Sequence, residues 1–386
     1  MTTVLVTALE ASGDVLGAEL MIALRQSFGP QTRFIGVGGP AMAAEGLQGA
    51  FDIAELSVMG LLEGLLAYRR ADRRARQLAE LAVRETPDIA VLIDSWGFSY
   101  LLARRLRAAQ PGLPLVKFVA PQAWATRPGR AKALARTFDR LLSIIAFEVP
   151  LFEAAGVPTT FVGHPALADD VPVGDRERLR ERIGAAPDDP VLLILPGSRA
   201  SEVTRLMPRF EEAMAILKGD RPDLHLVIAP AATVSAQVVA RAAGWPFRTH
   251  LIQDAEGRRD AMAAADVALA CSGTVTTELA AAGCPMVVAY RLGSLGYQIA
   301  RRIVRTRFIT LINIAADEEV TAEMIQGDCT GPKLARELAL RLDDPALRAR
   351  QAAAQTLALE NLGGRGPPPA RRAAEVIAEM LSRRAR

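Results

Sequence analysis

The sequence of 386 residues is long enough for two domains, each with a hydrophobic core of its own. Half of the residues are hydrophobic and 5% are aromatic, a balance typical of an α/β protein rather than of a disordered or disulfide-rich chain. The net charge of +3 is too small to indicate nucleic-acid binding by itself. Three histidines and three scattered cysteines predict no metal site and no disulfide framework.

Short aliphatic runs alternate with longer helical patterns along the chain, which predicts parallel sheets with helices on both faces. In the first half we expect strands at Val4–Ala8, Phe34–Val37, Ile89–Ile93, Leu115–Val119, Leu141–Ile145 and Thr160–Val162. In the second half we expect them at Val191–Leu195, Leu224–Ile228, His250–Ile252, Val267–Ala270 and Met286–Val288.

The region between the halves, residues 166–190, is rich in Asp, Pro and Gly. We expect a linker there, with one short basic helix at Arg176–Ile183. The predicted organisation is a Rossmann-like domain over residues 1–168, a second over 169–355 and a helical tail over 356–386. Two such lobes are expected to turn the carboxyl ends of their strands toward one cleft.

A turn in the second half, Ser272–Thr274, follows a buried strand and precedes a helix that is expected to begin near Val275. Such a turn presents backbone N–H groups and the positive end of a helix to phosphate oxygens. Gly273 lets phosphates approach the main chain, and Glu278 can accept a hydrogen bond from a ribose hydroxyl. An ordinary strand-to-helix turn with a Ser or Thr cap explains the pattern equally well.

A second turn of this kind, Leu195–Arg199, opens the second half. Arg199 can pair there with a diphosphate and neutralise charge on a departing nucleotide. The alternative is a surface arginine that pairs with Glu202.

Two features of the first half bear carboxylates at strand ends. The turn Leu9–Asp14 lacks the G-x-G-x-x-G pattern of dinucleotide sites, and its polar groups suit sugar hydroxyls better than a pyrophosphate. Asp94 ends the apolar strand Ile89–Ile93, where a carboxylate can act as a general base. In both places a residue that only caps the next helix is the alternative.

The segment at residues 58–70 is apolar and then abruptly basic. It predicts either a helix in a membrane interface or a core helix with a solvated end. No apolar run approaches the ~20 residues of a spanning helix, and no signal peptide is expected.

Taken in order, these motifs resemble the lipid A disaccharide synthase family, inverting glycosyltransferases of the two-lobed GT-B fold. The motifs that carry the resemblance are Glu10–Asp14, Gly38–Pro40 with Met42 and Glu45–Gly46, Val58–Gly60, Ile93–Asp94, Ala120–Gln122 with Trp124, Gly163–Pro165, Leu195–Arg199 with Glu202, Ser272–Thr274 with Glu278, and Tyr290–Arg291.

The resemblance implies a reaction that transfers 2,3-diacylglucosamine from its UDP conjugate to the 6-hydroxyl of 2,3-diacylglucosamine 1-phosphate. UDP leaves, and neither a metal nor another cofactor takes part. It implies a cytoplasmic enzyme bound peripherally to the inner leaflet of the inner membrane, and it leaves open whether the chain forms a homodimer. No nucleic acid is expected as a partner.

The resemblance also assigns residues to roles. It implies that Asp94 is catalytic, with Glu10 as a second catalytic carboxylate. Its substrate-binding residues correspond to Ser12, Asp14, Ser198, Arg199, Glu202, Ser272, Gly273, Thr274, Glu278, Tyr290, Arg291 and, in the cleft, Asn313. Its membrane surface corresponds to Leu61, Leu62, Leu65, Leu66, Arg69, Arg70 and Arg73.

Two alternatives remain open on the sequence. A UDP-N-acetylglucosamine 2-epimerase has a similar architecture but needs no apolar–basic segment. A nucleotide-sugar binding protein without catalytic activity is the second, and a turnover assay separates it from an enzyme.

Overall fold

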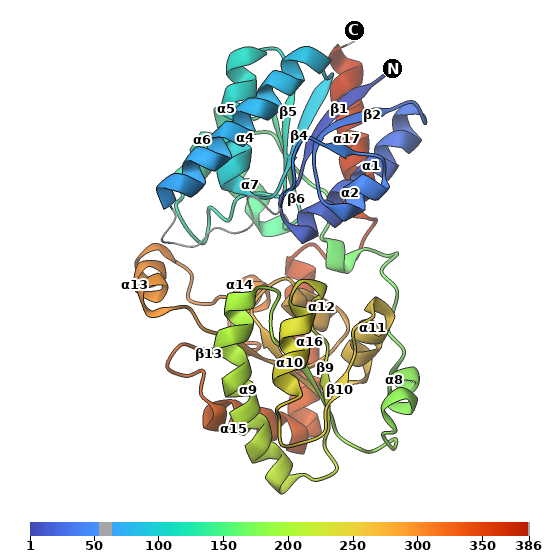
Figure 1. Ribbon diagram of the computed structural model, residues 1–386, viewed down its shortest axis with the longest axis vertical. Helices are drawn as coiled ribbons and strands as arrows, with labels where there is room; N and C mark the ends of the chain where they lie inside the picture. Colours follow the sequence, from blue (N-terminus) through green and yellow to red (C-terminus); the bar gives the residue numbers. More distant parts are fainter. Residues whose placement is uncertain (54–63, 385–386) are drawn as a thin grey trace. The chain divides into compact units, whose positions relative to one another are not determined.

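The computed structural model describes residues 1–53 and 64–384, which form two compact units (Figure 1). The first unit comprises residues 1–170, 303–305 and 365–386, and the second comprises residues 171–302 and 306–364. The region expected as a separate tail from residue 356 is therefore divided. Helix α16 (Pro345–Asn361) belongs to the second unit, whereas α17 (Pro369–Arg384) belongs to the first.

A parallel sheet of seven strands forms the centre of the first unit, in the order β3-β2-β1-β4-β5-β6-β7. Its strands are β1 (Thr3–Thr7), β2 (Arg33–Val37), β3 (Gln48–Gly49), β4 (Ile89–Ile93), β5 (Leu115–Phe118), β6 (Arg140–Ser143) and β7 (Thr159–Phe161). Its other helices are α1 (Ala11–Phe28), α2 (Pro40–Ala44), α4 (Gly64–Glu85), α5 (Trp96–Ala109), α6 (Gly129–Ala135) and α7 (Val149–Ala154).

Alternate residues of these strands enter different cores, as the two-residue period of a strand requires. Leu5 and Leu92 pack with α4, α5, α6 and α7 on one face. Val6 and Val91 pack with α1 and α17 on the other face, where α1 and α17 lie side by side (Figure 1). The near-continuous apolar runs in the sequence thus correspond to strands buried on both faces.

The second unit repeats this plan with a parallel sheet of six strands, in the order β10-β9-β8-β11-β12-β13. The strands are β8 (Val191–Leu195), β9 (His225–Ile228), β10 (His250–Leu251), β11 (Val267–Cys271), β12 (Met286–Tyr290) and β13 (Ala322–Ile325). The other helices are α8 (Arg176–Ile183), α9 (Ala200–Asp220), α10 (Ser235–Ala242), α11 (Ala255–Ala264), α12 (Val275–Ala281), α13 (Ser294–Ile303), α14 (Leu311–Ala316) and α15 (Gly331–Asp343).

Every strand expected from the sequence is present, and two further strands lie at sheet edges. These are β3, which has only two residues, and β13, whose sequence Ala-Glu-Met-Ile contains no apolar run. The basic helix α8 has the predicted bounds, but residues 171–190 are part of the second unit instead of a linker.

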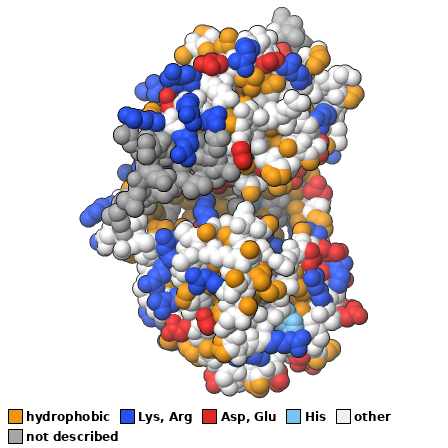
Figure 2. All heavy atoms as spheres, viewed as in Figure 1, with side chains coloured by type: hydrophobic (Ala, Val, Ile, Leu, Met, Phe, Trp, Pro, Cys, Tyr) orange, Lys and Arg blue, Asp and Glu red, His pale blue; other side chains and the backbone are white. Residues whose placement is uncertain are grey.

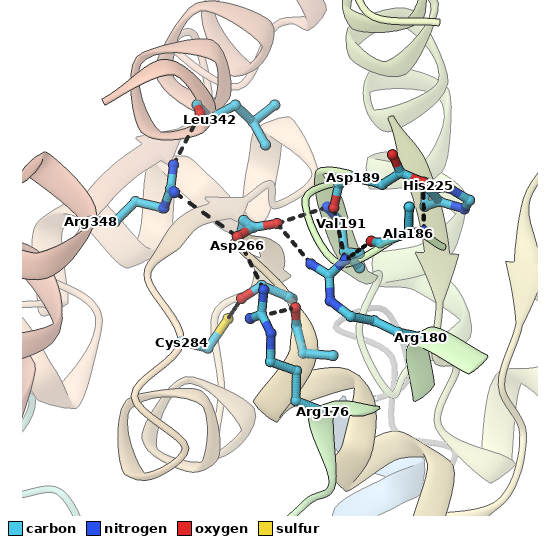
Figure 3. A network of polar contacts seen from close by, with 12 residues as sticks. Arg176, Arg180, Ala186, Asp189, Val191, His225, Asp266, Cys284, Leu342 and Arg348 are labelled. Carbon is cyan, nitrogen blue, oxygen red and sulfur yellow. Dashed lines mark hydrogen bonds and ion pairs between the residues drawn. The ribbon is translucent and has the colours of Figure 1, made fainter. Parts of the chain in front are cut away.

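An ion-pair network at the amino end of the second sheet holds α8 in place (Figure 3). Asp266 precedes β11, and its Oδ2 accepts a 2.9 Å hydrogen bond from the N–H of Val191 at the start of β8. Arg180 in α8 lies 3.7 Å from the same oxygen, and Arg176 and Arg348 each lie 4.0 Å from Oδ1. One carboxylate therefore joins α8, α16 and two neighbouring strands.

None of the helices in the described part of the chain combines the length and the apolar character that crossing a bilayer requires.

Candidate functional site

In each sheet the chain reverses its direction of progress across the sheet between two central strands, and loops leave the carboxyl ends of these strands in opposite directions. The switch lies between β1 and β4 in the first unit and between β8 and β11 in the second. Ligands of open α/β sheets bind outside the carboxyl ends of the strands at this point. The predicted sites after β1 and β4 lie at the first switch point, and the predicted turns after β8 and β11 lie at the second.

At the first switch point the structure brings the turn after β1 next to Asp94. Strands β1 and β4 pair in parallel, with Thr7 opposite Leu92. A Cβ atom on Gly13 would lie 3.7 Å from the Cβ of Asp94, which shows how closely the start of α1 approaches it. Glu10 and Ser12 are exposed at the same end of the sheet, and Asp94 is half-buried. Two carboxylates and a hydroxyl are therefore gathered there.

The backbone at Asp94 has an unusual conformation. The φ angles of Asp94 and Ser95 are +46° and +37°, a region that costs a residue with a side chain on the order of 1–3 kcal/mol. The hydroxyl of Ser99 donates a 2.7 Å hydrogen bond to the Asp94 carbonyl and helps to hold it. The N-cap position of α5 is occupied by Ser95 rather than by Asp94. Strain of this kind concentrates at functional sites.

Asp14 has a structural role that differs from the predicted substrate contact. Its side chain is buried, and its Oδ1 accepts hydrogen bonds from the N–H groups of Gly39 at 2.7 Å and Met42 at 3.1 Å. Its Oδ2 accepts a third bond, from Ala41 at 2.8 Å. Both oxygens are thus used to fix the amino end of α2 against α1, which corrects the assignment to substrate binding.

At the second switch point the two predicted phosphate turns lie side by side. Strands β8 and β11 pair in parallel, with Leu195 opposite Ala270. Gly197 has a φ of +107°, and a Cβ atom there would lie 2.7 Å from Oε2 of Glu202 and 3.3 Å from Sγ of Cys271. Only glycine fits at this place, because a side chain would displace one turn from the other.

Glu202 and Arg199 show the pairing that we described as the alternative. The Glu202 Oε2 accepts hydrogen bonds from the N–H groups of Ser198 and Arg199, both at 3.2 Å. Its Oε1 accepts a 3.2 Å bond from the Arg199 guanidinium, although the Arg199 side chain is 66% exposed. Glu202 therefore shapes the turn, which corrects its assignment as a substrate ligand, while the guanidinium of Arg199 and the Ser198 side chain remain accessible.

The turn after β11 has the predicted form. Strand β11 ends at Cys271, α12 begins at Val275, and Gly273 and Thr274 between them are exposed, with open space where a Cβ atom of Gly273 would be. Glu278 lies in the first turn of α12 and accepts a 3.1 Å hydrogen bond from Arg258. The main chain at this turn is thus open to a ligand.

Tyr290 and Arg291 follow on the next strand, β12. Tyr290 is half-buried, and burial, with Glu202 as the next cause, raises the pKa of its hydroxyl. The Arg291 guanidinium donates a 3.3 Å hydrogen bond to the Cys329 carbonyl. These side chains belong to the same carboxyl edge of the second sheet as the two turns.

Asn313 is a third correction. It is fully buried, and its amide nitrogen donates to the Thr321 carbonyl and to Glu323, each at 2.9 Å. Its oxygen accepts a 2.8 Å bond from the N–H of Thr321. Glu323 also accepts bonds from the N–H groups of Ile309 and Thr310. The side chain is thus part of the packing of α14 against β13, and it has no exposed surface for a substrate.

Sequence reasoning missed a buried carboxyl group that follows β6. Glu148 is 2% exposed, and it contacts the Ser143 hydroxyl at 2.6 Å and the Trp124 indole N–H at 3.0 Å. Burial raises its pKa to about 7. Trp124 was singled out only as part of a motif, and nothing in the sequence shows that a glutamate 24 residues later is its partner.

The predicted membrane segment is described in part. Leu61 and Leu62 lie outside the described residues, as do the side chains of Leu65 and Leu66. Arg69, Arg70 and Arg73 are exposed on α4. Lys and Arg side chains gather on this side of the first unit (Figure 2), where a groove of about 930 Å³ between α4 and α5 is lined by Tyr68, Arg76, Val83, Arg84, Leu101, Arg104 and Arg105, among others.

Across residues 1–53 and 64–384, no cluster of three or more His, Cys, Asp or Glu side chains is arranged to hold a metal ion.

Comparison with known proteins supplies the family. A model described as lipid-A-disaccharide synthetase matches residues 4–375. The lipid-A-disaccharide synthase of Rhodospirillum centenum is 42% identical over 375 residues, covering 97% of this chain and 94% of the relative. That of Paramagnetospirillum magneticum is 41% identical over 374 residues, covering 96% of each chain. The chain belongs to the lipid-A-disaccharide synthetase family.

Solved structures show that this synthetase has the GT-B fold. S. aureus MnaA, in a co-structure with UDP, aligns with a TM-score of 0.63 at 14% identity over 99% of this chain and 96% of its own. The calicheamicin glycosyltransferase CalG4 aligns with a TM-score of 0.62 at 17% identity over 100% of both chains. Identities this low carry the fold and nothing more.

Membership of the lipid-A-disaccharide synthetase family makes the chain a glycosyltransferase that forms the lipid A disaccharide. It disfavours the epimerase alternative. The UDP-GlcNAc 2-epimerase from Neisseria meningitidis aligns with a TM-score of 0.61 at 12% identity over 99% of both chains, so its likeness is one of fold. Sequence identity distinguishes the two reactions where architecture does not.

Proposed function

We propose that the chain transfers 2,3-diacylglucosamine from UDP to the 6-hydroxyl of 2,3-diacylglucosamine 1-phosphate with inversion at the anomeric carbon. The observation that carries the assignment of residues is the position of Asp94 at the carboxyl end of β4, at the switch point of the first sheet. Its half-buried carboxylate, held on a strained backbone, accepts the proton of the acceptor hydroxyl. The acceptor oxygen then forms the new glycosidic bond as the bond to UDP breaks.

The UDP site in this proposal is the carboxyl edge of the second sheet. The Ser272–Thr274 turn presents the exposed residues Gly273 and Thr274, and the exposed Arg199 side chain on the neighbouring turn supplies positive charge. Arg199 stabilises the charge that develops on the departing diphosphate. Glu278, Tyr290 and Arg291 complete the site on the nucleotide side, and Ser12 and Glu10 contact the acceptor sugar.

Both substrates carry acyl chains, and we propose that the enzyme meets them at the inner-leaflet surface of the inner membrane. The support in the described residues is the exposed basic row Arg69, Arg70 and Arg73 on α4, directly after an apolar stretch in the sequence. Such a row suits anionic headgroups beside buried acyl chains.

Replacement of Asp94 by Asn tests the assignment of the base. The variant should lose at least about a hundredfold in kcat and retain its affinity for UDP, because the amide cannot accept the proton but occupies the same space. The assay measures UDP release and disaccharide formation with purified protein and both acylated substrates.

Asp14→Asn is the matched control, since this carboxylate lies at the same end of the sheet but bonds only to backbone N–H groups among the contacts described. It should reduce thermal stability and leave the kcat of the folded protein near the wild-type value. Wild-type turnover by Asp94→Asn would show that Asp94 is not the base.

A further inference from the structure

Lys117 occupies a position of the first sheet where an apolar residue is expected. It is the third residue of β5 and is fully buried. Leu92 on β4 and Leu141 on β6 are its partners in the strand register, and both belong to the apolar core under α4 and α5. A buried ammonium group is costly unless all of its N–H groups are bonded, and an apolar side chain would be cheaper for stability alone.

The ammonium group is fully bonded, and its partners are the strand ends beside Asp94. The Nζ of Lys117 donates to the carbonyl oxygens of Asp94 at 2.5 Å, Leu92 at 3.1 Å and Phe118 at 3.2 Å. The Asp94 carbonyl also accepts the bond from Ser99, and the Phe118 carbonyl accepts the Asp94 N–H at 2.9 Å. Both peptide groups that flank the Asp94 Cα are therefore tied, directly or through Phe118, to this one lysine.

The carbonyl groups that Lys117 binds lie next to strained residues. Asp94 and Ser95 have positive φ angles, and Val119, directly after Phe118, has a φ of +69°, which is rare for a β-branched residue. Neighbouring structure must hold such residues in place, or they relax to ordinary conformations. Lys117 is a donor placed at the junction of these segments.

We propose that Lys117 is a positioning residue of the glycosyl transfer, which holds the strained Asp94 backbone so that the Asp94 carboxylate points to the acceptor. This inference rests on the proposed role of Asp94 and extends it to a residue that does not touch the substrate. It requires the ammonium form, because a neutral amine has only two N–H groups and would direct a lone pair at one of the three carbonyl oxygens.

The surroundings of Lys117 indicate the pH at which it loses the ammonium form. Burial lowers its pKa to about 7, an effect that the charge of Asp94 partly opposes. Asp94, directly after β4, is the charged group that acts on it, while β6 faces it with Leu141 and α5 presents the hydroxyl of Ser99 nearby. As the pH rises through about 7, the ammonium form is lost, so kcat should fall on the alkaline side.

Lys117→Met tests the proposal, since methionine fills a similar volume without donors. We expect kcat to fall at least about tenfold with the KM for the UDP-sugar unchanged, and the alkaline fall of kcat to disappear. The double variant Lys117→Met/Asp94→Asn should have a kcat only slightly below that of Asp94→Asn alone, because both changes act through one carboxylate. A purely structural lysine would lower stability and leave the shape of the pH profile unchanged.

The outcomes separate the two proposals. Asp94→Asn could have low turnover while Lys117→Met keeps wild-type turnover and an unchanged alkaline fall of kcat. This result would overturn the positioning role of Lys117 and leave the proposed base in place. Wild-type turnover by Asp94→Asn would overturn the proposed base as well. If Lys117→Met does not fold, Ser99→Ala removes the other donor to the Asp94 carbonyl. It should lower kcat severalfold at constant KM, and an unchanged kcat would overturn the proposal.

Discussion

The buried carboxyl group of Glu148 should make the stability of the first unit depend on pH. The Ser143 hydroxyl has one hydrogen, yet its oxygen lies 2.8 Å from the Ile145 carbonyl and 2.6 Å from Oε1 of Glu148. Both contacts are hydrogen bonds only if Glu148 is protonated and donates to Ser143, whose hydroxyl then donates to Ile145. This agrees with the burial that raises the Glu148 pKa from its ordinary 4.5 to about 7.

The sign and size of the effect follow from this pKa. The unfolded chain releases the Glu148 proton near pH 4.5, but the folded chain holds it until about pH 7. The folded state therefore binds more protons between these values, and the free energy of unfolding falls as the pH rises through them. At 1.36 kcal/mol for each pH unit, the full loss is about 3 kcal/mol. The stabilisation is complete below pH 4.5.

Glu148→Gln should remove this dependence, because its amide can donate to Ser143 and accept from Trp124 but cannot ionise. The free energy of unfolding of the variant minus that of the wild type should therefore be about 2–3 kcal/mol larger at pH 8 than at pH 5. Urea unfolding followed by tryptophan fluorescence in a Trp245→Phe background measures the first unit. Replacement of the exposed Glu153 on α7 by Gln is the control. An equal stability difference at both pH values would refute the assignment of a protonated Glu148.

Two further predictions concern ligands. Arg199→Ala should weaken UDP binding about 30-fold, since a charge-assisted hydrogen bond contributes about 2 kcal/mol. Calorimetry measures the affinity for UDP. The control is Arg209→Ala, which removes an arginine paired with Glu212 and should leave the affinity unchanged. Replacing Arg69, Arg70 and Arg73 by Gln should release the protein from anionic vesicles in sedimentation at low salt, because each basic group contributes up to about 1 kcal/mol. If the folded variant sediments with the vesicles as the wild type does, α4 is not part of the membrane-binding surface.

Most strand positions were predictable because the central strands β1, β4, β8, β11 and β12 are largely apolar runs between turn residues. The two unpredicted strands, β3 and β13, lack such a run, and their pairing depends on neighbours distant in the sequence. The helix after β1 begins at Ala11, ahead of the apolar residues Val15 and Leu16.

The roles of polar residues were harder to predict. Asp14, Glu202 and Asn313 have the residue types of a sugar or phosphate site, but the structure pairs them with groups of the protein itself, most of them in the backbone. For Asp14 these partners lie 25 to 28 residues away, so sequence spacing does not reveal them. Lys117 was overlooked for the opposite reason, because one lysine in an apolar run is consistent with a surface residue at a strand end.

The division of the chain between the units has a consequence for its synthesis. Helix α17 covers α1 and one face of the first sheet, but the ribosome makes it only after the entire second unit. Until then Leu20, Leu24 and Val91 lack the cover that Ala373 and Ile377 provide in the folded unit. This apolar face of the first unit thus stays exposed until α17 is synthesised, and such a face binds other incomplete chains and general chaperones. The second unit, which needs no residue beyond Gly364, can complete its fold first.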